Sequence, residues 1–153
     1  RFTQQNIITY IIGRNQQKLN DAIAALGPNA RAISSDLTEL SLIPTIVDQI
    51  VKKEGHIDVL VNNAGINLKK DFTDVTDEEF QHILLTNVTS VFSISREVVK
   101  YMLPQHNGCI INISSMAAQY GLPKVIAYTA SKTAIEGMTR AMATELSPKG
   151  IRV

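Results

Sequence analysis

The sequence predicts an α/β protein in which a doubly wound parallel sheet carries helices on both faces. Short apolar runs alternate along the chain with longer segments whose apolar residues recur at helical spacing. The short runs are too apolar for strands with one face in water, which is typical of parallel strands buried between helices. Because right-handed crossovers join such strands, we expect all their carboxyl ends at one edge of the sheet, where ligands bind.

The first half of the chain is expected to hold three strands and two helices. The first helix starts after Asn15, a favourable N-cap, and stops at Gly27 and Pro28. The second helix runs from Leu42 to near Gly55. A run rich in β-branched residues predicts a strand at 7–12, and further strands are expected at 30–34 and 57–61.

The second half continues the alternation. Thr76 and the acidic residues behind it begin a long helical stretch that runs toward Pro104. A fourth strand is expected at 110–113, followed by a helix rich in small residues from about 126 to 146. Residues 151–153 look like the opening of a further strand.

Composition narrows the functional classes. The 153 residues carry 15 basic and 14 acidic side chains and are 44% apolar, as expected of one globular domain. This balance excludes the basic footprint of nucleic-acid or membrane-surface binding, and no apolar run is long enough to span a bilayer. Cys109 has no partner for a disulfide and lies in an apolar run, which favours a reducing compartment. No secretory signal opens the chain, so a cytoplasmic location is expected.

Tyr128 and Lys132 are the first residues that suggest chemistry. They lie four apart on the expected last helix, so their side chains project from one face. A tyrosine hydroxyl exchanges protons near neutral pH only when a nearby positive charge stabilises its phenolate form. Ser115 follows one strand and residues 62–65 follow another, which places both on the expected ligand-binding edge. On the residues alone, a solvated lysine beside a half-buried tyrosine and ordinary polar turns remain the alternative.

Taken together, these residues carry a family resemblance. The run Asn62-Asn63-Ala64-Gly65, Asn87, Ser115 and Tyr128-x-x-x-Lys132, in this order and spacing, resembles the short-chain dehydrogenase/reductase family. Asp36 and residues 147–153 are similar too, so the resemblance extends along the chain. It implies a Rossmann-type fold and hydride transfer between a nicotinamide cofactor and a small secondary alcohol or ketone. The 3-oxoacyl-carrier-protein reductases and gluconate 5-dehydrogenases are the most similar kinds of member.

The resemblance also implies roles for the matching residues. Tyr128 would be the general acid or base, Lys132 would assist it and bind the nicotinamide ribose, and Ser115 would hydrogen-bond the substrate oxygen. Asn87 would hold a water linking Lys132 to solvent, which gives a reason for an interruption of the long helix there. Contacts with the adenosine half of the cofactor are implied for Asp36, Leu37, Asn63, Ala64 and Gly65. No metal is expected.

Arg14 bears on the choice of cofactor. Family members that prefer NAD usually carry an acidic residue at the end of this strand. The guanidinium of Arg14 suits a 2'-phosphate, so NADP is the expected cofactor and NAD is possible. A solvated arginine at a strand end is the alternative.

The sequence departs from the family pattern at the phosphate loop. Its eight glycines contain no Gly-x-x-x-Gly-x-Gly, the loop that precedes the strand expected at 7–12 in the family. Residues 1–153 are therefore expected to form a single, incomplete dinucleotide-binding domain of a longer protein. The alternative is a catalytically silent structural or regulatory relative that lacks the loop. The complete set of Asn87, Ser115, Tyr128 and Lys132 favours the enzyme.

A homodimer or homotetramer is expected through the two long helices. Each helix carries more apolar surface than one sheet face would cover, and family members pair these helices across a two-fold axis. The alternative is that all these residues pack onto their own sheet. They are Val91, Ile94, Val98 and Met102 on the first helix, and Met138, Ala141 and Met142 on the second.

Overall fold

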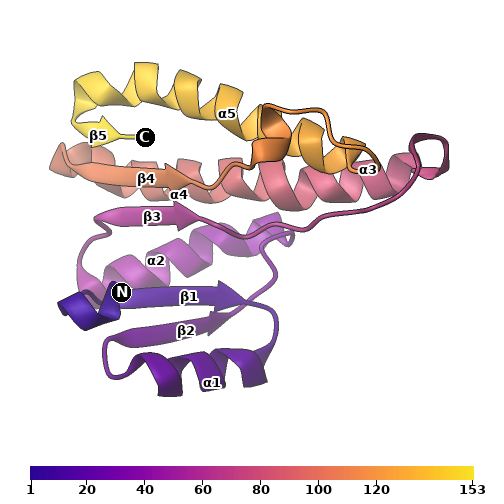
Figure 1. Ribbon diagram of the computed structural model, residues 1–153. Coiled ribbons are helices and arrows are strands. Elements are labelled where there is room, and N and C mark those ends of the chain that lie inside the picture. The colour runs from indigo at the N-terminus through magenta and orange to yellow at the C-terminus, as the bar shows by residue number, and fades with distance from the viewer. The chain divides into compact units, whose positions relative to one another are not determined.

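The computed structural model describes residues 1–153 as two compact units, residues 1–42 and 43–153. All paired strands are parallel and helices connect them, so the α/β class is confirmed. The strands form two ladders rather than one, a pair β1-β2 in the first unit and the order β3-β4-β5 in the second (Figure 1).

The first unit contains one strand–helix–strand crossover. After a short 3-10 turn, β1 (Thr9–Gly13), α1 (Gln16–Leu26) and β2 (Ala30–Ser34) follow in order, and α1 lies along the two strands (Figure 1). The Asn15 side chain accepts a hydrogen bond from the Lys18 amide at 2.9 Å, which confirms the expected N-cap. β1 begins two residues later than expected, because the Ile7 amide donates to the Phe2 carbonyl instead of joining the ladder.

The second unit contains the remaining helices and three strands, close to the expected ranges. Its elements are α2 (Ile43–Glu54), β3 (Val59–Asn62), α3 (Asp77–Leu84), α4 (Ser90–Gln105), β4 (Gly108–Asn112), α5 (Ile126–Leu146) and β5 (Ile151–Arg152). Short 3-10 turns occupy 72–74, 116–118 and 147–149. β4 is the central strand of the sheet.

The register of β3 and β4 brings their carboxyl ends side by side. Asn62 pairs with Asn112, and Leu60 pairs with Ile110, so all four side chains share one face of the sheet. This face meets the helices, because Asn62 bonds to Ser95 on α4. The residues that continue from β3 and from β4 therefore leave the sheet at one edge, as expected for parallel strands.

The long helical stretch is interrupted where Asn87 lies. Thr76 caps its start in a reciprocal capping box with Glu79. Residues Leu85–Thr89 then form a π-helical turn between α3 and α4, so the expected interruption is confirmed. A π-helical turn widens the backbone by one residue and is frequent at functional sites.

The apolar stripe of α4 is not an assembly surface. Val91, Ile94, Val98 and Met102 are each at most 5% exposed, because they pack inside the second unit, where α4 contacts β3, β4 and α2. The expectation that this stripe has apolar surface left over for assembly is therefore wrong, because α2 covers it together with the sheet. The outer side of α4 instead carries Phe92, which is 48% exposed and lies under the guanidinium of Arg96.

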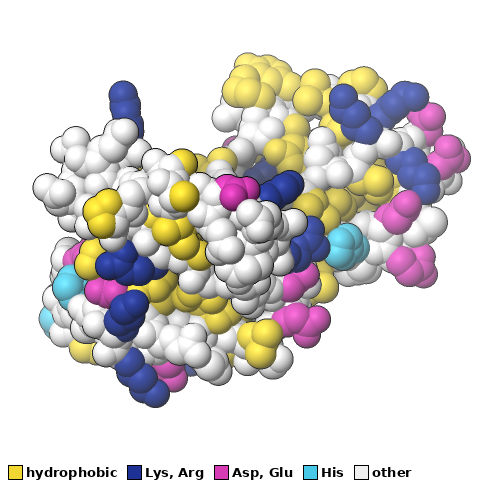
Figure 2. Space-filling view, turned by 90° about the horizontal axis from the view of Figure 1, so that it is seen from below, with side chains coloured by type: hydrophobic (Ala, Val, Ile, Leu, Met, Phe, Trp, Pro, Cys, Tyr) yellow, Lys and Arg dark blue, Asp and Glu magenta, His cyan; other side chains and the backbone are white.

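The helices have no membrane-spanning character, and one face of the surface shows no large cluster of like charge. None of the helices combines the length and the apolar character that crossing a membrane requires. On the face drawn in Figure 2, Lys and Arg side chains lie among Asp and Glu side chains rather than in one large patch. This matches the net charge of +1.

Candidate active site

Tyr128 and Lys132 lie on the first turns of α5 at the carboxyl edge of the second sheet. The Lys132 Nζ atom lies 5.7 Å from the centroid of the Tyr128 ring. Lys132 is only 5% exposed, and its Nζ donates a hydrogen bond of 2.6 Å to the Ile113 carbonyl just beyond β4. A buried ammonium group requires such acceptors. The carbonyl takes one of its three N–H groups, which leaves donors for a ligand.

Asn87 ties the residues after β3 to α5. Its Oδ1 accepts from the Ile66 amide at 2.8 Å and its Nδ2 donates to the Ile66 carbonyl at 2.8 Å. The same Nδ2 donates to Ser131 Oγ at 3.0 Å, and Ser131 Oγ donates to the Tyr128 carbonyl at 2.7 Å. Asn87 is 1% exposed, so these contacts account for its buried amide group.

Gly65 allows these groups to come close together. A Cβ placed on Gly65 would lie 3.3 Å from Asn87 Oδ1 and 3.7 Å from Lys132 Nζ. The structure thus brings Gly65, Asn87, Tyr128 and Lys132 into one cluster. Asn63 and Ala64 precede Gly65 and are exposed at the end of β3.

Ser115 lies beyond the end of β4 and caps the turn at 116–118. Its backbone is extended, and its Oγ accepts a hydrogen bond of 3.2 Å from the Ala117 amide. It is two residues from Ile113, the residue that binds Lys132. A hydroxyl, a tyrosine and a buried ammonium group at one strand end can bind an oxygen atom and exchange a proton with it.

A buried polar network beneath this edge was missed by sequence reasoning. Asn62 Nδ2 donates to Ser95 Oγ at 3.0 Å and to Asn112 Oδ1 at 2.8 Å. Asn112 Nδ2 donates in turn to Thr139 Oγ1 at 2.9 Å. The network joins α4, β3, β4 and α5 at the level where the strands end. The signal available in the sequence was an asparagine at the end of two apolar strands, Asn62 in β3 and Asn112 in β4.

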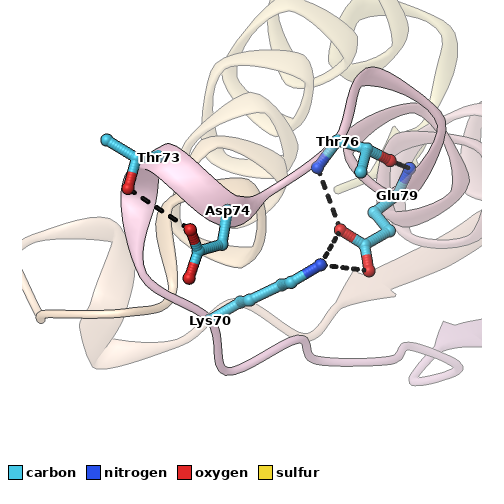
Figure 3. Close-up of polar contacts among 5 residues, drawn as sticks. All are labelled: Lys70, Thr73, Asp74, Thr76 and Glu79. Carbon is cyan, nitrogen blue, oxygen red and sulfur yellow. Dashed lines mark hydrogen bonds and ion pairs between the residues drawn. The ribbon is translucent and has the colours of Figure 1, made fainter.

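The segment after Gly65 is anchored to α3 and to the loop between Ser115 and Tyr128. Lys70 Nζ donates to both carboxylate oxygens of Glu79 at 2.9 Å, and Glu79 also accepts from the Thr76 amide (Figure 3). The Thr76 amide and then Lys70 lower the pKa of Glu79. The Lys70 amide donates to the Lys124 carbonyl at 2.8 Å, and the Lys124 side chain pairs with Asp71 at 3.2 Å.

The remaining expected cofactor residues lie in the first unit. Arg14 Nη1 and Asp36 Oδ2 are 3.5 Å apart, just beyond β1 and β2. Asp36 Oδ1 accepts from the Thr38 amide at 2.9 Å and from the Thr38 hydroxyl at 2.8 Å. These bonds from Thr38, with a smaller contribution from Arg14, lower the pKa of Asp36. Leu37 is half-buried beside it.

The parallel strands and their connecting helices define an α/β protein of the Rossmann type. The sequence model of the short chain dehydrogenase family matches residues 1–153. The chain belongs to this family.

Known relatives agree with this assignment. The chain is 37% identical to 2-dehydro-3-deoxy-D-gluconate 5-dehydrogenase of Escherichia coli over 134 residues, which cover 87% of this chain and 53% of the relative. A xylitol dehydrogenase solved with NAD+ is 34% identical, with a TM-score of 0.89 over 94% of this chain and 57% of its own. ElxO solved with NADP is 32% identical, with a TM-score of 0.93 over 99% of this chain and 63% of its own. The chain thus spans little more than half the length of these proteins.

Proposed function

We propose that the protein transfers a hydride between NADP(H) and a small secondary alcohol or ketone, with Tyr128 as general acid and base. The observation that carries this proposal is the buried Lys132 ammonium group, which lies beside the Tyr128 ring and binds the carbonyl of Ile113, two residues before Ser115. Burying an ammonium group whose N–H groups are not all paired costs free energy. Stabilising a phenolate and binding a ligand would both give the unpaired N–H groups of Lys132 a partner.

The residues present fit a nicotinamide cofactor. When bound, this cofactor supplies or accepts the hydride. Lys132 keeps N–H groups that can bind ribose hydroxyls, and Gly65 leaves the approach to Lys132 free of a side chain. In the first unit, Arg14 is exposed and would bind a 2'-phosphate, while Asp36 and Leu37 would contact adenine. Two structural neighbours, solved with NADP and with NAD+, support a cofactor of this class.

In the direction of reduction, the Tyr128 hydroxyl would donate a proton to the substrate carbonyl oxygen. Ser115 Oγ would hydrogen-bond the same oxygen and stabilise the negative charge that develops there. Lys132 would stabilise the resulting phenolate, and Asn87 would hold a water through which the proton is replaced. In oxidation, Tyr128 would accept the proton instead.

Replacing Tyr128 by Phe tests this function, because only the hydroxyl group is lost. We expect turnover of NADPH with a panel of ketones to fall by about 100-fold or more. Tyr120→Phe is the matched control, since Tyr120 is 59% exposed on the neighbouring loop and should leave turnover unchanged. Near wild-type turnover in Tyr128→Phe would refute the assignment. A wild-type protein that binds cofactor without turning over any ketone would favour the silent relative.

The proposed preference for NADP is tested at Arg14. Exchanging Arg14 for Asp removes the partner of the 2'-phosphate and adds an acceptor for the ribose diol. We expect the ratio of NADP to NAD affinity, measured by calorimetry, to fall at least about tenfold. Lys18→Asp makes the same change of charge at an exposed position of α1 and should leave the ratio unchanged. An unchanged ratio in Arg14→Asp would show that Arg14 does not select the cofactor.

The proposal extends to organisation and assembly. We propose that both units belong to one dinucleotide-binding domain, supported by the family match that runs through both. A cytoplasmic homodimer or homotetramer would form through the outer faces of α4 and α5, where Phe92 is 48% exposed. Light scattering at micromolar concentration tests this assembly. A wild-type monomer would refute it, and Phe92→Glu should yield one.

A further inference from the structure

We propose that Glu136 and Ser114 form a positioning pair, which holds Ser115 in place relative to Tyr128 while Lys132 serves the cofactor. Ser114 Oγ donates a hydrogen bond of 2.9 Å to Glu136 Oε1. The inference rests on the proposed function, because it assigns this pair to support the catalytic serine of that reaction.

The pair is one of three consecutive bonds between the end of β4 and a single face of α5. Lys132, Glu136 and Thr139 follow one another at helical spacing of four and three, so their side chains lie along one face. The three bonds are Asn112 Nδ2 to Thr139 Oγ1 at 2.9 Å, Lys132 Nζ to the Ile113 carbonyl at 2.6 Å, and Ser114 Oγ to Glu136 Oε1 at 2.9 Å.

The bond from Ser114 matters because the sheet no longer holds the chain at this point. The β3-β4 ladder ends with Asn112, and the last backbone bond across it runs from the Ile113 amide to the Asn62 carbonyl at 3.1 Å. Ser114 and Ser115 lie beyond that bond. A side-chain contact with α5, the helix that carries Tyr128, therefore replaces the ladder in fixing their position.

The neighbouring hydrogen bond from Lys132 to the Ile113 carbonyl does not by itself fix the position of Ser114 and Ser115. The ammonium group that binds the Ile113 carbonyl is the one that the proposed function requires at the ribose and beside Tyr128. The remaining N–H groups of Lys132 serve those partners, so Lys132 fixes only the Ile113 carbonyl and gives Ser114 and Ser115 no bond of their own. In the proposed function Glu136 serves neither the ribose nor Tyr128, and a hydroxyl that donates to a carboxylate makes a charge-assisted bond, here 2.9 Å long. The pair thus holds Ser114, and with it Ser115, in place while Lys132 serves the cofactor.

A shift at Ser114 would reach the catalytic hydroxyl directly. Ser115 Oγ and the Ser115 carbonyl accept hydrogen bonds from the Ala117 and Ala118 amides, so Ser115 and the turn at 116–118 move together. Small displacements of a catalytic group, of the order of 1 Å, can reduce turnover by about 100-fold. Loss of the pair is expected to slow the reaction without weakening cofactor binding.

The test compares variants of the full-length enzyme that remove the bond from either side. Ser114→Ala and Glu136→Ala should each lower kcat about tenfold while KM and the cofactor Kd stay within about twofold. The double variant should be no worse than either single variant, because both remove the same bond. Glu136→Gln retains an acceptor oxygen and should restore most of the rate. Glu145→Ala, at an exposed position of α5, is the control and should change nothing.

Two further measurements separate positioning from other roles. In Glu136→Ala the midpoints of the pH–rate profile should stay where they are, whereas a shift would mean that the carboxylate acts through its charge. Hydrogen exchange at the Ala117 and Ala118 amides should accelerate in both alanine variants, since the turn loses its anchor.

The proposal is overturned if both alanine variants keep the wild-type kcat and the wild-type hydrogen-exchange rates at Ala117 and Ala118. It is also overturned if the losses in kcat of the two single variants add in the double variant. If the wild-type enzyme turns over no carbonyl substrate, the proposed function fails. The exchange experiment still decides whether Glu136 positions residues 114–118.

Discussion

Replacing Asn87 by Ala should destabilise the protein, because it leaves two backbone groups of Ile66 without a hydrogen-bond partner. The substitution removes the side-chain amide of Asn87, which makes hydrogen bonds of 2.8 Å to both the backbone N–H and the backbone carbonyl of Ile66. It also removes a donor to Ser131 Oγ, but Ser131 keeps its own bond to the Tyr128 carbonyl. The loss is therefore concentrated at Ile66, the residue that follows Gly65 at the edge of the site.

The magnitude follows from these two groups. Leaving a buried backbone donor or acceptor unpaired costs about 1–3 kcal/mol. Ile66 is half-buried, so water can reach part of its backbone and the cost lies toward the lower end of that range. We expect the free energy of unfolding to fall by about 2 kcal/mol in total. Asn87→Asp should be at least as damaging at neutral pH, because a carboxylate oxygen would then face the Ile66 carbonyl.

Urea denaturation followed by circular dichroism measures this change. A loss of 2 kcal/mol lowers the midpoint by about 1 M at a typical m-value of about 2 kcal/mol per molar. Thr89→Ala is the matched control, since Thr89 is exposed on the same π-helical turn and should change stability by less than about 0.5 kcal/mol. A loss below about 0.5 kcal/mol in Asn87→Ala would refute the assignment of these bonds as stabilising.

Two further predictions concern backbone conformation and pH. Gly150→Ala should lower the free energy of unfolding by at least about 2 kcal/mol more than Gly55→Ala does, as measured by thermal unfolding. Both glycines have positive φ, but of the two only Gly150 would place a Cβ against the His106 carbonyl. Equal losses in the two variants would contradict this. The hydrogen bond from Lys100, followed by that from Arg96, lowers the pKa of the buried Glu97 below its ordinary value of 4.5. The stabilisation by this carboxylate is therefore present above pH 4.5 and lost as the pH falls through the folded pKa. Glu97→Gln should lower stability near neutral pH and approach the wild-type value in acid, and a constant difference at all pH values would show that Glu97 does not titrate with folding.

Local chemistry made most of the elements predictable. Apolar runs identified every strand, and Asn15 and Thr76 marked helix starts that the structure confirms. The strand limits differed by up to two residues, because they depend on partners rather than on propensity: Ile7 bonds to Phe2 instead of to a neighbouring strand. The spacing of Tyr128 and Lys132 on one helix was likewise readable, since the helical period alone places both side chains on one face.

What the sequence by itself determined was therefore the alternation of strands and helices and the positions of Ser115, Tyr128 and Lys132 at strand and helix ends. Only the tertiary structure decided that Asn87 bonds to Ile66, that Ser114 bonds to Glu136, and that the apolar stripe of α4 is buried. Periodicity reports which residues share a face of one element. It does not report which distant element covers that face, because this depends on strand register and on the paths of the crossovers. Nor does it report the partner of a given polar side chain, because many other polar side chains could have made the same hydrogen bond.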